Sequence, residues 1–179
     1  PTRYSPRLVV VRNLIEDGQI GDVLELRGRG KEDSRGGGAD LWVLGTHIMN
    51  MIHYLGGEPQ WCFATVRQDG HPITKADVHP GTEGIGPLTG DSLNAIYGMD
   101  GGVTAYFSSH KDMAGNPRRF ALRILGSKGI IEITTGYVPQ VRLLADSSWS
   151  PGRSGKSWVS VSSAGVAKDE PLADKTNDN

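Results

Sequence analysis

The residue with the clearest chemical potential is His47, which lies in an amphipathic segment between two glycine clusters. Glycines 36–38 precede the segment, and Gly56 and Gly57 follow it with the conformational freedom that ends a helix. A histidine titrates near neutral pH, so it can both take and return a proton. A lone histidine beside a core is also common as a hydrogen-bonded structural residue. Both a general acid or base and a structural role therefore stay open for His47.

Residues 40–54 predict a helix, because apolar residues recur on one side at about 100° per residue. The apolar stripe, which should face a core, comprises Leu41, Leu44, Ile48, Met51, Ile52 and Leu55. A neighbouring, more polar stripe comprises Asp40, Val43, His47, Asn50 and Tyr54. The pattern thus places His47 at the flank of the buried face.

The glycines and the charged loop before this helix allow two interpretations each. Glycines 36–38 lack side chains, which would let backbone amides approach a ligand, or they form a hinge or a loop packed tightly on a neighbour. The loop contains Lys31, Asp33 and Arg35 and is either merely solvated or lines one cleft with His47. In that cleft, Lys31 or Arg35 would hydrogen-bond hydroxyl groups or a carboxylate.

Composition restricts the class of protein. The 179 residues suffice for one domain with a sizeable core, and a net charge of −1 gives no sign of nucleic-acid or anionic-membrane partners. Cys62 is the only cysteine, so an internal disulfide is excluded and a reducing compartment is permitted. The start at Pro1 resembles the middle of a chain, so we expect a fragment or processed product whose parent's targeting signal would not be visible. We expect a cytoplasmic location.

The remaining pattern predicts an α+β fold. Residues 6–17 suit a first helix and residues 23–30 a half-buried strand, whereas residues 69–90 form a long excursion rich in glycine and proline. Further strands, several joined by glycine turns, are predicted at residues 61–66, 92–99, 103–109, 118–125, 129–134 and 139–145. Hairpin connections indicate a two-layer domain, an open and largely antiparallel sheet with helices packed on one face. We place this domain at residues 1–163 and a polar, frayed tail at residues 164–179.

Two other kinds of site find little support. The glycines of residues 84–90 and 28–30 lack the spacing and the following helix of a dinucleotide fingerprint. His47 and His53 would lie on different helix faces, and the other histidines show no tight spacing. We therefore predict neither a metal site nor a dinucleotide-binding fold in this chain.

Three segments, taken in order, resemble one enzyme family. They are Gly18-Gln19-Ile20-Gly21-Asp22-Val23, the central helix with its glycines, and Gly126-Ser127-Lys128-Gly129-Ile130-Ile131-Glu132. Over about residues 1–145 the chain resembles the C-terminal domain of the Gfo/Idh/MocA (glucose–fructose oxidoreductase and inositol dehydrogenase) family. The resemblance implies that a Rossmann domain absent from this chain binds NAD or NADP. It also implies that this domain contacts the substrate and forms homo-oligomers through its sheet.

The resemblance also implies residue roles. His47 matches the family histidine that moves a proton at the substrate hydroxyl while hydride passes to nicotinamide, and Lys31, Asp33, Asp40 and Asn50 become candidate substrate contacts. The parent would then be an NAD(P)-dependent oxidoreductase for a sugar, polyol or related hydroxy compound, and the fragment alone would be inactive. Val43 and Asn50 stand where many members carry aspartate. This departure favours the alternative, a non-catalytic binding or oligomerisation module with a vestigial site.

Overall fold

The computed structural model describes residues 2–135 and 139–172 and has the predicted α+β content, with a large, mostly antiparallel sheet and few helices. The chain divides into two compact units. The first contains the chain up to Leu26 and from Leu122 onward, and the second is Arg27–Ala121. Strand β1, Val23–Arg29, contributes residues to both.

The first unit packs helix α1 over antiparallel strands in the order β12-β11-β10-β9-β8-β1. Helix α1, Pro6–Glu16, begins at a proline, which suits a first helical position, and buries Leu8 and Val11. Short helices are η1, Thr2–Tyr4, and α4, Pro151–Ser154. The strands are β8, Ala121–Gly126; β9, Ile130–Thr134; β10, Gln140–Leu144; β11, Val159–Ser162; and β12, Gly165–Val166.

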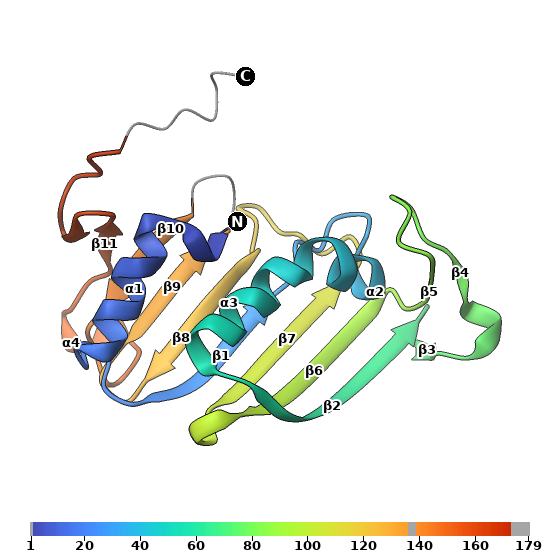
Figure 1. The fold of residues 1–179 in the computed structure, drawn as a ribbon, viewed down its shortest axis with the longest axis horizontal. Helices are drawn as coiled ribbons and strands as arrows, with labels where there is room; N and C mark the ends of the chain where they lie inside the picture. The colour runs from blue at the N-terminus through green and yellow to red at the C-terminus, as the bar shows by residue number, and fades with distance from the viewer. Residues whose placement is uncertain (1, 136–138, 173–179) are drawn as a thin grey trace. The chain divides into compact units, whose positions relative to one another are not determined.

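The second unit orders its strands β1-β7-β6-β2-β3, and one helical segment lies across a face of them (Figure 1). The strands are β2, Pro59–Gln68; β3, His71–Pro72; β6, Ser92–Met99; and β7, Thr104–His110. The predicted excursion contains η3, Lys75–Asp77, and a pair of two-residue strands, β4, His79–Pro80, and β5, Pro87–Leu88. The predicted turn between β6 and β7 is η4, Asp100–Gly102.

The central helix is longer than predicted and contains a wider turn. It runs through α2, Gly37–Asp40; a π-helical stretch η2, Leu41–Gly45; and α3, Thr46–Gly56. Ile48 lies over Gly28 of β1, and Gly45 lies over Phe107 of β7. A π turn holds one more residue than an α turn, so it rotates the preceding residues by about 100° relative to a regular helix. This offset explains why Asp40 is completely buried instead of sharing the partly exposed stripe of His47.

Most predicted elements are confirmed to within a few residues. The serine-rich stretch before residue 165 gave no strand prediction, yet it forms β11, which pairs with β10 at Val141 and Val161. In the segment predicted as a tail, β12 pairs with β11, and the Glu170 carboxylate contacts the Arg7 guanidinium at 2.7 Å. Residues 173–179 of that segment lie outside the described residues. Within the described part of the chain, no helix has the length and apolar character needed to cross a membrane.

Candidate functional site

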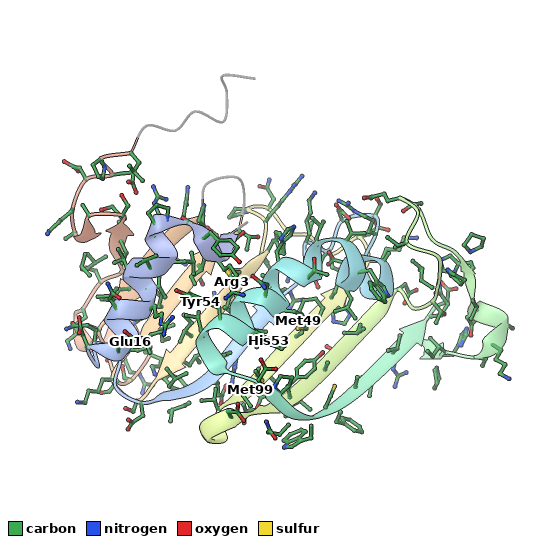
Figure 2. All side chains as sticks on the ribbon, in the orientation of Figure 1. Arg3, Glu16, Met49, His53, Tyr54 and Met99 are labelled. Carbon is green, nitrogen blue, oxygen red and sulfur yellow. The ribbon has the colours of Figure 1, made fainter. Side chains whose placement is uncertain are left out.

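His47 lies in the first turn of α3, at the flank of the buried face as the periodicity predicts. Its side chain is half-buried, whereas Ile48 and Met51 beside it are completely buried and fix the rotation of the helix. Asn50, one turn further on, is exposed. Figure 2 shows His53 beyond them on the same helix, where its Nδ1 lies 3.6 Å from Glu58 Oε2. The packed helix therefore holds the imidazole of His47 on a rigid backbone with part of the ring accessible.

Glycines 36–38, the glycine run, pack closely against the backbone of neighbouring segments. Gly37 donates its amide to Ser109 Oγ at 3.1 Å, and Gly38 donates its amide to the carbonyl of Gly90 at 2.9 Å. A side chain at Gly36 would strike the backbone of Lys111. The interpretation as tight packing is thus confirmed, and the interpretation as free amides is wrong for Gly37 and Gly38. Only glycine allows the helix to begin this close to neighbouring backbone.

The charged loop forms a chain of ion pairs. Asp33 Oδ2 lies 3.2 Å from Lys31 Nζ and 2.6 Å from Arg35 Nη2, and Arg35 Nη1 lies 3.1 Å from Glu83 Oε1 in the excursion. The hydrogen bond from Arg35 is the main reason that the pKa of Asp33 lies well below its usual range, and the same pair raises the pKa of Arg35. An ammonium group has three donors, so Lys31 can pair with Asp33 and still serve another acceptor.

Asp40 is enclosed beneath the helix and not on its outer side. Its Oδ2 accepts hydrogen bonds from Ser109 Oγ at 2.6 Å and from the Glu32 amide at 3.1 Å, and its Oδ1 is buried without a hydrogen-bond partner. The four predicted substrate contacts therefore differ in exposure: three are at least partly exposed, and Asp40 is buried. Lys31 and Asp33 meet in the loop and Asn50 is exposed on α3, whereas Asp40 supports the loop from below.

Glu32 is a residue that the sequence did not single out. It lies between Lys31 and Asp33, yet its carboxylate is completely buried and paired with arginine. In the sequence it is one more charge in a charged loop, and no periodicity marks it as buried. Its burial depends on partners that come from a distant part of the chain.

Among the described residues, side chains that could hold a metal ion are not grouped together, and the glycine run is the place to compare with a dinucleotide site. None of the described histidine, cysteine and carboxylate groups cluster in a way that could hold a metal. The junction of β1, the glycine run and α2 has the order of a phosphate-binding turn, but Ser109 and Gly90 already occupy two of its amides. These two amides are therefore not free to bind the phosphates of a dinucleotide.

Comparison with known proteins decides the family. The model of the GFO/IDH/MocA C-terminal domain matches residues 8–132. The chain belongs to this family. The resemblance inferred from the three sequence segments is therefore confirmed. No curated protein sequence matches the chain significantly.

Solved structures agree with this family fold. A levoglucosan dehydrogenase in complex with NADH and levoglucosan aligns with 99% of this chain and 51% of its own, with 20% identity and a TM-score of 0.65. An NAD-binding oxidoreductase from Klebsiella pneumoniae covers 89% of this chain and 45% of its own, with 14% identity and a TM-score of 0.61. A 3-ketoreductase from Actinomadura kijaniata, in complex with TDP-benzene and NADP, covers 88% and 44%, with 16% identity and a TM-score of 0.60. The GFO/IDH/MocA chain described here thus spans about half the length of these relatives.

Proposed function

We propose that this chain is the substrate-binding and assembly domain of an NAD(P)-dependent oxidoreductase that acts on a sugar, a polyol or a related hydroxy compound. The observation that carries the proposal is the family match together with a half-buried histidine fixed on α3. The name of a structural neighbour, levoglucosan dehydrogenase, supports a carbohydrate-like substrate.

In this proposal, His47 takes the proton of the substrate hydroxyl as that group becomes a carbonyl, and the hydride from the same carbon would pass to the nicotinamide bound by the rest of the parent. An imidazole suits this role because its pKa lies near neutral pH. Lys31 donates a hydrogen bond to a substrate oxygen, and Asn50 offers both a donor and an acceptor from the next turn of α3. Asp33 orients Lys31 through their ion pair, and Asp40 holds the loop from beneath.

The cofactor of the parent is NAD or NADP, bound by a part that this chain does not contain. The structural neighbours with NADH and NADP support a nicotinamide, and the occupied amides of Gly37 and Gly38 support a site elsewhere. The chain alone should therefore bind neither dinucleotide in calorimetric titration. Binding of NADH to the chain alone would contradict this part of the proposal.

The decisive experiment replaces His47 in the full-length parent. After a panel of sugars and polyols has given a substrate, His47→Ala should lower kcat by about 100-fold or more, the usual contribution of a general base. His53→Ala is the matched control, since His53 lies on the same helix and pairs with Glu58. Equal turnover in the His47 variant and the wild type would remove the catalytic role and favour the vestigial site that Val43 and Asn50 suggest.

A second candidate function, self-association, has its own observation. On the face of the second unit opposite the helix, β2, β6 and β7 carry a largely apolar patch consisting of Trp61, Phe63, Ile96 and Tyr106, of which the first two are exposed and the others partly exposed. Phe63, Ile96 and Tyr106 are cross-strand partners, and such partners share a face. Phe63 is 65% exposed and Trp61 53% exposed, the kind of apolar surface that marks an interface. We propose that a second copy of the chain covers this patch.

Sedimentation of the chain at several concentrations tests the assembly proposal. The double substitution Trp61→Ser with Phe63→Ser should shift the species to a monomer, because the largest apolar groups of the patch are removed. Val78→Ser, an exposed apolar residue in the excursion, serves as the control. A wild-type chain that is monomeric at every concentration would refute association through this face.

A further inference from the structure

The Glu32 carboxylate is held from several sides at the end of β7. Its Oε2 lies 2.8 Å from Arg29 Nε and 3.5 Å from Arg119 Nη2, and its Oε1 accepts the amide of His110 at 2.9 Å. None of the side chain is exposed. A buried carboxylate needs this set of donors, because desolvation of an unpaired charge costs several kcal/mol.

The backbone of Glu32 is fixed as well. Its amide donates to Asp40 Oδ2 at 3.1 Å, and its carbonyl accepts the amide of Met113 at 2.9 Å. Its φ of 57° lies in the left-handed region, which costs a non-glycine residue about 1 kcal/mol or more. A strained residue that carries a buried charge persists only where its surroundings fix it, and such residues cluster at functional sites.

These contacts of Glu32 also fix the backbone of its two neighbours, whose side chains are partly exposed. Lys31 and Asp33 flank Glu32, and each keeps about a quarter of its side chain exposed. The carbonyl of Asp33 accepts the amide of Asp112 at 3.0 Å, so the loop is joined to the segment after β7 both at Glu32 and at the residue that follows it. Arg35 then holds the Asp33 carboxylate, which in turn contacts Lys31 Nζ. The ammonium group of Lys31 is therefore paired with a carboxylate whose backbone neighbour, Glu32, is buried.

We propose that Glu32 is a positioning residue, which sets Lys31 and Asp33 for contact with the hydroxy substrate without touching the substrate itself. The inference rests on the proposed function for its link to catalysis. Its structural half, the ordering of residues 31–35 by the buried carboxylate, stands on the contacts alone. Two experiments separate these halves.

The first experiment measures amide hydrogen exchange in the chain itself. Glu32→Gln keeps the shape of the side chain and removes its charge, so the loop loses its ion pairs with Arg29 and Arg119. The Arg35 amide, which donates to Asp33 Oδ1 at 3.0 Å, should then exchange about tenfold faster, the equivalent of about 1.4 kcal/mol of local opening. Glu132→Gln is the matched control, since Glu132 is also a buried glutamate between two arginines. Unchanged exchange of Arg35 in Glu32→Gln would overturn the inference, whether or not the parent is an oxidoreductase.

The second experiment measures steady-state kinetics of the full-length parent. Glu32→Gln should raise the KM for the hydroxy substrate about fivefold or more while kcat stays within about twofold, because contacts made in both the ground and the transition state are lost. The KM for the dinucleotide should not change, and Glu132→Gln should alter neither constant. A lower melting temperature with an unchanged substrate KM would make Glu32 a purely structural residue. His47→Ala is assayed in parallel, so that a failure of the proposed function is seen separately.

Discussion

Two buried glutamates, one in each unit, are each paired with two arginines, but one lies in a paired strand and the other in a loop. Glu132 lies on β9, and its carboxylate contacts Arg123 of β8 at 2.5 Å and Arg142 of β10 at 2.6 Å. Glu32 lies in a loop without strand pairing, and its carboxylate also accepts the backbone amide of His110. The chemistry of the two clusters is similar, and their structural settings differ.

The difference shows what a buried ion pair can hold in place. Glu132 and Arg142 are already partners in the β9–β10 register, so backbone hydrogen bonds hold these strands whether or not the charges meet. Two backbone hydrogen bonds, from Met113 and Asp112, reach the loop at Glu32 and Asp33. The Glu32 carboxylate adds the hydrogen bond to the His110 amide and the ion pairs. We expect an ion pair to contribute little to the stability of strands that are already paired, and more to a loop that has few backbone hydrogen bonds.

The largest effect is expected on removal of Glu32. Glu32→Ala should lower the free energy of unfolding by about 3 kcal/mol, because the His110 amide loses its acceptor and Arg29 and Arg119 lose their common partner. Glu132→Ala should cost about 1–2 kcal/mol, since its half-exposed arginines can be hydrated and the β9–β10 pairing remains in place. Urea denaturation of both variants measures the difference. Equal losses would mean that the loop does not depend on its carboxylate.

The next effect concerns the space around Asp40. A methyl group at Gly30 would lie 2.8 Å from Ser109 Oγ and would strike Asp40 Oδ2, so Gly30→Ala should cost about 2 kcal/mol. Gly152→Ala in α4 is the control, because nothing lies within 4 Å of its added methyl group. That substitution should be neutral or stabilising by up to about 1 kcal/mol. Thermal unfolding of the two variants decides, and a tolerated Gly30→Ala would show that the Asp40 cluster can relax.

A smaller effect, visible through pH, concerns a third carboxylate. The Ser163 hydroxyl and amide, followed by Arg7, lower the pKa of Glu170 from 4.5 to about 2. A carboxyl with a lowered folded-state pKa stabilises the fold above its unfolded pKa, and this contribution is lost as pH falls. The stability gap between the wild type and Glu170→Gln should thus be full above about pH 4.5 and close towards pH 2. Urea midpoints measured from pH 2 to pH 7 test this, and a gap that does not vary with pH would exclude the ion pair.

The smallest effect is expected at an exposed pair on α1. Arg12 Nε lies 2.7 Å from Glu16 Oε1, and both side chains are more than half exposed. Glu16→Gln should lower the free energy of unfolding by no more than about 0.5 kcal/mol, because water and salt screen such pairs. Denaturation at low and high salt measures it. A loss as large as that of Glu132→Ala would remove the distinction between exposed and buried pairs.

Local patterns in the sequence predicted most of the fold and part of the site. Alternation located β6 at the observed bounds, and the apolar period of the central helix placed His47 correctly at the edge of the core. The same period misplaced Asp40, because a π turn between Asp40 and His47 leaves no mark in the spacing of apolar residues. Strand β11 was missed because its alternation lasts only four residues within a stretch rich in serine and glycine, and its pairing with β10 is not visible in the sequence.

The sequence by itself determined most of the elements, the buried face of α3 and the family, since each depends on patterns of residues close together in the chain. Tertiary structure decided which carboxylates are enclosed and what the glycine run is for. Glu32 meets the amide of His110 across 78 residues, and Asp40 meets Ser109 across 69. A charge can be buried only where donors, here from such distant segments, surround it. A local sequence pattern does not show which distant segments will lie beside it.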